Sequence, residues 1–276
     1  MIPTRTTAAA AAVLLSAASA CSSAATPQGD TCTALFGQPA AKTGLTSAQC
    51  QPSCACAGVS FTPPTYSPAF VAGLVSGWTL DNPSPPLTEN PYAASPPPDD
   101  PFDTVCGVLP TASGAAPRPY LLVTYASESA ARAAGASVTH FGHCGVCSSL
   151  ENLAVYMGVN DLTDPVRACG IASTTFDANV ACLQGLGFDL PCAQIWAYNT
   201  ANTRARCLTP CIAALDQPYH LPDGRLNDCI RCDEEQSGAV FKAVAGRTRR
   251  NSGLPNALCR PCSEVRPLVH DYGAAR

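Results

Sequence analysis

The predicted fold is built around the stretch Val138-Thr139-His140-Phe141-Gly142-His143-Cys144-Gly145-Val146-Cys147-Ser148-Ser149-Leu150. An extended apolar run ends there in a Cys-x-x-Cys pair, with two histidines just before the pair and a helical pattern just after it. Ser148 is the expected N-cap of a helix from Ser149 to about Met157, because a serine hydroxyl accepts a hydrogen bond from the free N–H groups of a first turn. Any redox or metal chemistry in this chain is therefore expected at this junction of strand and helix.

Two strands and a short helix are predicted up to this junction. Residues 119–125 have the strongest strand pattern, since their apolar run is wide enough to be buried on both faces. Ser127 caps a short helical pattern that Gly135 ends, and residues 138–142 form a second strand. This order predicts two parallel strands joined by a right-handed crossover. Residues 106–118 are interpreted as a turn-rich entry to the first strand.

Beyond residue 160 the sequence predicts helices and no strong strand. Asp189 is an expected N-cap, and Cys207 and Cys211 follow at the i, i+4 spacing of one helical face. Most of these helices carry a cysteine, and short helices that bury little apolar area are expected to be cross-linked. The predicted fold class is therefore α+β, with a small sheet at about 119–142 followed by a disulfide-rich helical half.

Residues 1–20 have the pattern of a secretory signal peptide. A short start with Arg5 precedes a run of small apolar residues that is too short to span a bilayer. The end of this run, Ala18-Ser19-Ala20-Cys21, resembles the lipobox of bacterial lipoprotein precursors, although that family usually has Leu where this chain has Ala18. The resemblance implies that Cys21 is the lipidated first residue of the mature chain and attaches it to the outer or plasma membrane. Without lipidation, the expectation is a secreted protein.

Residues 21–101 are expected to form a cysteine- and proline-rich flap or linker with a loop-rich structure. Proline removes backbone donors and favours extended conformations, so the proline-dense part, 82–101, is not expected to form regular structure. It is predicted to be either a stiff spacer or an ordered strap on the surface. Residues 102–276 form the expected disulfide-stabilised domain. No motif in residues 21–101 indicates a more specific role for this flap or linker.

The cysteine count supports export. The chain has 17 cysteines, and removing Cys21 leaves the even number that a complete set of disulfides requires. Two further Cys-x-x-Cys units occur, Cys229 with Cys232 and Cys259 with Cys262. In a cytosolic chain they would indicate zinc, but behind an export signal disulfides are the simpler interpretation.

The unit formed by Cys144 and Cys147 permits a redox hypothesis. A helix N-terminus lowers the pKa of a thiol because its dipole and free N–H groups favour the thiolate. The region 119–157 locally resembles the thioredoxin family, whose active site has Cys-Gly-Pro-Cys after a strand and before a helix. The resemblance implies that Cys144 is the nucleophile and Cys147 the resolving thiol. Val146 replaces the proline of thioredoxin itself, no tryptophan precedes the motif, and the later hairpin with a cis-proline has no counterpart, so a structural disulfide is the favoured interpretation.

His140 and His143 permit a metal hypothesis. Together with Cys144 and Cys147 they would supply two nitrogens and two sulfurs, a set that suits zinc or copper. Successive residues of a strand face opposite sides, and His140 and His143 are three positions apart. One strand therefore does not aim both histidines at one ion without a bend at Gly142. No metal site and no cofactor are favoured, and each histidine is expected to be a hydrogen-bonded polar group.

Charge and motifs exclude several classes of function. The net charge of −4 and the presence of only two lysines, Lys42 and Lys242, argue against a nucleic-acid-binding face. The one dense basic cluster, Arg247, Arg249 and Arg250, is expected to lie in a solvated loop, with an anion site as the alternative. Nucleophile-elbow, phosphate-loop and dinucleotide motifs do not occur. The sequence therefore predicts an exported, lipid-anchored cell-envelope protein with a binding or structural role, with a thiol–disulfide oxidoreductase and a metal-binding protein as the alternatives.

Overall fold

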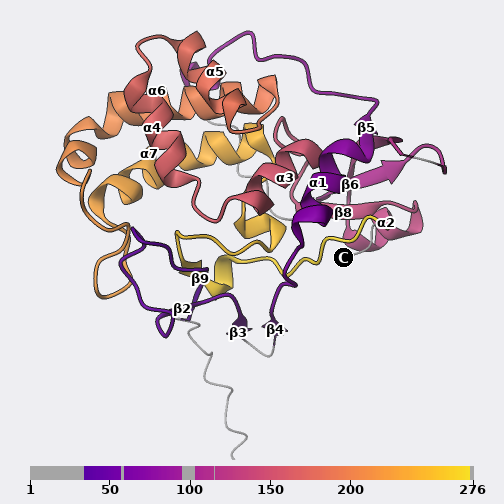
Figure 1. Ribbon diagram of the computed structural model, residues 1–276, viewed down its shortest axis with the longest axis horizontal. Coiled ribbons are helices and arrows are strands. Elements are labelled where there is room, and N and C mark those ends of the chain that lie inside the picture. The colour runs from indigo at the N-terminus through magenta and orange to yellow at the C-terminus, as the bar shows by residue number, and fades with distance from the viewer. Residues whose placement is uncertain (1–33, 57–58, 95–102, 115, 274–276) are drawn as a thin grey trace, which may run out of the picture. The chain divides into compact units, whose positions relative to one another are not determined.

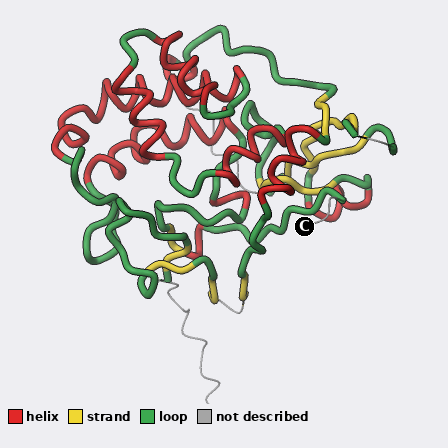
Figure 2. The backbone as a smooth tube through the Cα atoms, in the orientation of Figure 1, coloured by secondary structure: helices red, strands yellow, loops and turns green. Residues whose placement is uncertain are grey.

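A four-stranded sheet and a group of helices are the two main parts of the structure (Figures 1 and 2). The computed structural model describes residues 34–56, 59–94, 103–114 and 116–273. The predicted signal peptide and Cys21 lie outside these residues. The described residues belong to one unit, Thr31–Arg276. The mixed α+β class predicted from the sequence is confirmed.

The main sheet has the strand order β5 (Trp78–Leu80), β7 (Arg118–Tyr125), β6 (Val105–Pro110) and β8 (Ser137–Phe141). β6 is antiparallel to both β7 and β8, whereas β5 is parallel to β7. The predicted strands β7 and β8 therefore run in the same direction, as expected, and are connected through the segment between them in the chain, with β6 lying between them in the sheet. The interpretation of residues 106–118 as turns was wrong for β6, which buries Val105, Cys106 and Val108.

Three short helices accompany this sheet. α1 (Pro68–Ser76) packs on α3 (Leu150–Gly158), and α2 (Glu128–Ala133) joins β7 to β8. The hydroxyl of Ser127 caps α2, as predicted. The cap of α3 is Ser149 instead of Ser148, because the Ser148 hydroxyl is engaged by His140 and by the backbone N–H of Gly145.

The helical half consists of α4 (Thr163–Ala172), α5 (Phe176–Gly185), α6 (Leu190–Ala213) and α7 (Asp228–Ala245). α6 packs along α7, and α4 and α5 pack on α6 (Figure 1). Asp189 caps α6 through the Cys192 N–H, as predicted. α6 is interrupted at Cys207, three residues before Pro210, because proline removes a helical hydrogen bond and clashes with the preceding turn.

The N-terminal region contains short strands, one of which pairs with a strand of the C-terminal segment. β1 (Leu35–Phe36) lies between β2 (Cys50–Gln51) and β9 (Arg260–Pro261), and β3 (Cys54–Cys56) pairs with β4 (Val59–Phe61). The 3-10 helices η2 (Arg250–Ser252) and η3 (Cys262–Glu264) lie in the C-terminal segment.

The described part of the proline-rich segment, 82–94, is an ordered strap on α6. The Leu87 N–H donates to Gln194 Oε1 at 2.7 Å, and the Gln194 amide donates back to the Leu87 carbonyl at 3.2 Å. The 3-10 helix η1 (Pro91–Ala93) places the Tyr92 hydroxyl 2.8 Å from Asn199 Oδ1 of α6.

Disulfides connect these parts. Within the described residues they are Cys50–Cys259, Cys54–Cys262, Cys106–Cys144, Cys147–Cys192, Cys169–Cys182, Cys207–Cys232 and Cys211–Cys229. The prediction of a disulfide-rich helical half is confirmed. So many disulfides indicate an oxidising, exported environment. No helix in the described part of the chain is long and apolar enough to cross a bilayer.

Candidate functional site

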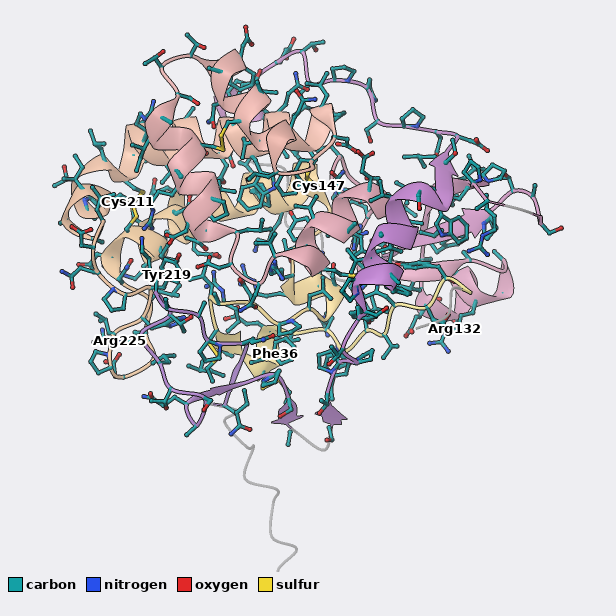
Figure 3. All side chains as sticks on the ribbon, in the orientation of Figure 1. Phe36, Arg132, Cys147, Cys211, Tyr219 and Arg225 are labelled. Atoms are coloured by element: carbon teal, nitrogen blue, oxygen red, sulfur yellow. A yellow bond between two sulfur atoms is a disulfide. The ribbon has the colours of Figure 1, made fainter. Side chains whose placement is uncertain are left out.

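The two cysteines of the redox hypothesis are not bonded to each other. Cys144 is joined to Cys106 of β6, and Cys147 is joined to Cys192 of α6. Cys147, labelled in Figure 3, is fully buried. The two disulfides connect the strand-to-helix junction to the sheet on one side and to the helical half on the other. A thioredoxin-like exchange would require both cysteines to change partners.

The two histidines of the metal hypothesis bond to protein groups. His140 is buried; its Nδ1 lies 3.0 Å from the Phe141 carbonyl and its Nε2 lies 2.7 Å from the Ser148 hydroxyl. His143 Nε2 lies 2.7 Å from the Ala243 carbonyl. Burial lowers the pKa of His140 well below its usual value, and Arg247 lowers it further. Among the described residues, no three His, Cys, Asp or Glu side chains gather where they could hold a metal ion.

The basic cluster is buried, so the prediction of a solvated loop was wrong. Arg247 is fully buried and Arg249 is 8% exposed. Arg247 donates to the carbonyls of Thr139, Cys147 and Ser148 and to the hydroxyls of Thr139 and Ser252. These acceptors lie in three separate segments, which a single planar guanidinium therefore holds together.

The strongest candidate site is a cavity of about 400 Å³ in the helical half. Its walls come from α4, α6, α7 and the segment from Thr248 to Val265. Two of its lining residues, Phe36 and Cys211, are labelled in Figure 3. This volume lies within the range of about 300–1,000 Å³ that is typical of small-molecule sites.

The lining of this cavity is mainly apolar. Aromatic rings of Tyr156, Trp196 and Phe241 form part of the interior, with the centroids of Trp196 and Phe241 4.6 Å apart. Four large apolar side chains among the lining residues remain exposed to solvent, namely Ile171 (65%), Ile212 (60%), Leu208 (52%) and Leu215 (37%). We call these four residues the apolar rim. Exposed apolar side chains grouped in this way are characteristic of binding sites.

Several polar atoms buried in the cavity lining have no hydrogen-bond partner in the protein. They are Tyr156 Oη, Arg167 Nη1, Trp196 Nε1 and Asn256 Oδ1. Burial raises the pKa of Tyr156 to about 12, and the nearby Trp196 N–H opposes this effect without reaching hydrogen-bonding geometry. A buried polar group without a partner costs about 1–3 kcal/mol, so these atoms favour a bound molecule that supplies one.

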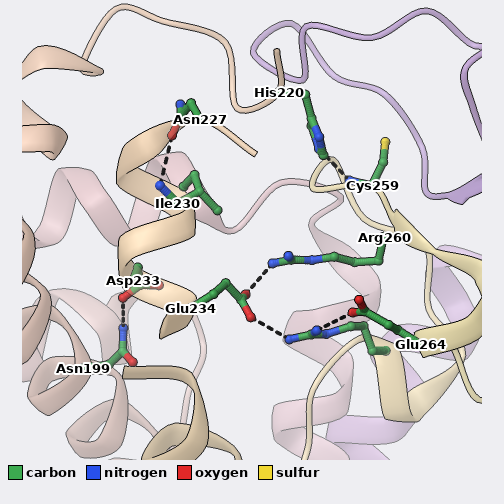
Figure 4. Close-up of polar contacts among 10 residues, drawn as sticks. Asn199, His220, Asn227, Ile230, Asp233, Glu234, Cys259, Arg260 and Glu264 are labelled. Atoms are coloured by element: carbon green, nitrogen blue, oxygen red, sulfur yellow. Dashed lines mark hydrogen bonds and ion pairs between the residues drawn. The ribbon is translucent and has the colours of Figure 1, made fainter. Parts of the chain in front are cut away.

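The two acidic side chains of the lining are already engaged by protein groups (Figure 4). Asp233 accepts hydrogen bonds from Asn199 at 3.1 Å and from Thr203, while burial raises its pKa. Glu234 forms ion pairs with Arg250, at 2.8 Å, and with Arg260, which is labelled in Figure 4. Burial alone would raise the pKa of Glu234, but the two guanidinium groups lower it.

The cavity carries an excess of positive charge. Its basic lining residues are Arg167, Arg204, Lys242, Arg249, Arg250 and Arg260, against only Asp233 and Glu234. The formal charge of the lining is therefore +4, in a chain whose net charge is −4. Burial lowers the pKa of Arg249 to about 10, which leaves it charged at neutral pH.

The sequence predicted Cys211 on one helical face with Cys207, but it did not predict that Cys211 lies close to the other residues of the cavity lining. The cavity depends on how α4 crosses α6 and on the return of the C-terminal segment, which local patterns do not specify. The one available signal was the clustering of arginines near 247–250, which was interpreted as solvated.

Residues 176–267 match a family of unknown function, DUF8771. The matched segment contains α5, α6, α7, η2, β9 and η3, and hence most of the cavity lining. No curated protein and no solved structure matches the chain.

Proposed function

We propose that this protein is an exported binding protein that holds a small, largely apolar molecule in the cavity between α4, α6 and α7. The observation that carries the proposal is the set of buried polar atoms without protein partners in a mainly apolar cavity of about 400 Å³. Such a combination of apolar walls with a few convergent polar groups is typical of ligand sites. The disulfides make the scaffold suitable for an oxidising compartment.

We further propose that the mature chain is attached to a membrane through a lipid on Cys21. The support is the sequence Ala18-Ser19-Ala20-Cys21 at the end of the signal-like run. Mass spectrometry of the N-terminal peptide of the exported protein tests this: a lipid mass on Cys21 is expected, and an unmodified cysteine or a different first residue would refute it.

The binding proposal is tested with an uncharged fluorescent probe, N-phenylnaphthylamine. The chain has two tryptophans, of which Trp196 lines the cavity and Trp78 belongs to strand β5 of the sheet. In the Trp78→Phe variant, which keeps Trp196, we expect saturable energy transfer from tryptophan to the bound probe. No saturable transfer would contradict the proposal.

Gly238 offers a way to fill the cavity without disturbing the fold. It lines the cavity from within α7, and a Cβ placed on it would approach only Glu234 Oε2, at 3.6 Å. We expect Gly238→Phe to abolish probe binding, because the new ring occupies the ligand volume. Gly73→Phe is the matched control, since Gly73 also lies within a helix, α1, has open space around it and is remote from the lining. Equal probe binding by Gly238→Phe and the unaltered protein would count against this cavity as the site.

A further inference from the structure

We infer that the ligand of this cavity is an amphipathic anion whose carboxylate is held by Arg167 while its hydrocarbon part lies on the apolar lining. This inference rests on the proposed function and assigns the chemical class of the ligand. It is carried by three observations: the unequal charge of the lining, the unused donor on Arg167 and the apolar rim.

Arg167 is distinguished from the other arginines of the lining by what it lacks, and from the exposed side chain of Lys242 by its buried donor. Within the described residues it has no side-chain hydrogen bond and no ion pair, and its guanidinium lies 5.9 Å from the centre of the Tyr219 ring. Its Nη1 atom is buried in the cavity wall without an acceptor. A buried guanidinium nitrogen without an acceptor leaves a strong, charge-assisted donor available to a ligand.

The other arginines of the lining are already engaged. Arg249 donates to the carbonyls of Pro255, at 3.0 Å, and Val159. Arg250 and Arg260 share Glu234. Arg204 donates to the carbonyl of Gly170, which is one turn along α4 from Arg167. Arg204 therefore brings a second positive charge to the part of the lining that contains Arg167. Anion recognition at this wall therefore depends on Arg167, with Arg204 adding to the local positive potential.

The apolar residues of the lining determine the chemical character of the part of the ligand that does not contact Arg167. The lining that contains Arg167 and Arg204 also presents the hydrocarbon surface of Trp196, Phe241 and the apolar rim. A polyanion would leave this surface uncovered, and an uncharged apolar molecule would leave the Arg167 donor buried and unpaired. A single carboxylate on a short hydrocarbon chain satisfies both requirements. Free fatty acids of short to medium length have this chemistry.

The experiment compares octanoate, 1-octanol and octylamine as competitors of the probe bound to the full protein. We expect octanoate to displace the probe at least about tenfold more strongly than 1-octanol, since one charge-assisted hydrogen bond contributes about 1.5–3 kcal/mol. Octylamine is expected to be the weakest of the three. The variant Arg167→Met keeps the length and apolar stem of the side chain and should remove the advantage of octanoate while leaving 1-octanol unchanged.

Two controls separate the outcomes. Arg206→Met alters an exposed arginine of α6 outside the lining and should leave all three affinities unchanged. Arg167→Lys should restore part of the preference for octanoate because it restores the charge without the fork of donors. Equal displacement by octanoate and 1-octanol, or an Arg167→Met variant that keeps the preference, would overturn the anion inference and leave the proposed binding function standing. Failure of the probe and of all three compounds to bind would instead overturn the binding function itself.

Discussion

At the scale of single residues, the buried guanidinium of Arg247 holds three segments of the chain together. Arg247 has five N–H groups, and its five hydrogen bonds have lengths between 2.6 and 3.2 Å. All the acceptors are neutral carbonyl or hydroxyl oxygens. Burial lowers the pKa of Arg247, so the hydrogen bonds must compensate for the desolvation of the charge. This geometry is specific to arginine.

The first prediction concerns the substitution Arg247→Lys. An ammonium group has three donors and no planar fork, so it cannot reach acceptors on Thr139, Cys147, Ser148 and Ser252 together. We expect the free energy of unfolding to fall by about 3 kcal/mol or more, because several buried acceptors lose their partner at about 1–3 kcal/mol each. Urea unfolding under non-reducing conditions measures this. Arg132→Lys, on the exposed face of α2, is the control and should change stability by less than about 0.5 kcal/mol. Equal losses for the two variants would show that the buried network is not the cause.

At the scale of elements, α6 and α7 are joined by two nested disulfides. Cys211–Cys229 closes the inner loop, with a sequence separation of 18, and Cys207–Cys232 closes the outer one, with a separation of 25. Both lie at the interrupted end of α6, which also carries Leu208 and Ile212 of the apolar rim. The two disulfides therefore hold the same part of the cavity lining in place.

The second prediction follows from this nesting. Once one disulfide closes the loop, the other removes little additional chain entropy from the unfolded state. We expect the pair of substitutions Cys207→Ser and Cys232→Ser to cost about 1 kcal/mol, and the same for Cys211→Ser with Cys229→Ser. Removing both disulfides should cost about 3 kcal/mol or more, which exceeds the sum of the separate losses. Chemical unfolding of the three variants tests this non-additivity, and strictly additive losses would refute it.

The same variants report on the cavity. Removal of both disulfides should also weaken binding of the uncharged probe, because the end of α6 is no longer held against α7. Substituting serine at both Cys106 and Cys144 is the control, since that disulfide joins β6 to the junction before α3 and neither cysteine lines the cavity. This control should lower stability while leaving probe affinity unchanged.

Local chemistry explains which elements the sequence predicted. Ser127 and Asp189 cap α2 and α6 because their side chains and the following apolar spacing together specify a helix start. β6 was missed because it contains Gly107 and ends at Pro110, and its stability comes from pairing with β7 and β8, which are distant in sequence. The displacement of the α3 cap from Ser148 to Ser149 has the same origin, since His140 competes for the Ser148 hydroxyl only in the folded chain.

The sequence predicted less of the candidate site than of the fold. The number of cysteines indicated that disulfides form but not which cysteines pair. The bonds of Cys144 to Cys106 and of Cys147 to Cys192 were therefore not predictable from the sequence. The cavity arises from residues of α4, α6, α7 and the C-terminal segment that are up to about a hundred positions apart. Arg167 carried no local signal, because the importance of its side chain lies in the absence of a partner for one buried nitrogen.

At the scale of the whole molecule, three buried histidines link folding to pH. His140 and His270 are fully enclosed, and His220 is 3% exposed. Burial lowers the pKa of each of them, and it lowers that of His270 to about 3. In the unfolded chain the same side chains titrate near their ordinary value of about 6.5. At a pH between the lowered pKa of the folded protein and the ordinary pKa of the unfolded chain, the unfolded state binds more protons than the folded state.

The third prediction is therefore that stability is greatest above about pH 6.5 and falls as the pH decreases from 6.5 towards 3. Each histidine contributes at most about 1.4 kcal/mol per pH unit, so the three together contribute a slope of at most about 4 kcal/mol per pH unit. Carboxyl groups modify the curve: the raised pKa values of Glu151, Asp189 and Asp233 oppose the loss, whereas the lowered pKa of Glu234 adds to it. The interval from pH 6.5 to pH 5 begins at the ordinary pKa of histidine and lies above the ordinary pKa of carboxyl groups, about 3.9 to 4.3. Urea midpoints across that interval measure the effect, with the slope m checked for constancy.

His270→Gln separates the histidine effect from a general loss of stability. The imidazole Nε2 lies 2.8 Å from the Ser252 carbonyl and Nδ1 lies 2.9 Å from the Tyr272 hydroxyl, so the variant is expected to be less stable at pH 7.5. Its dependence on pH between 6.5 and 5 should nevertheless be smaller by up to about 1.4 kcal/mol per pH unit, because one of three groups that take up protons on unfolding has been removed. A variant that keeps the full slope would show that His270 is already protonated in the folded protein, which its burial beside Arg247 argues against.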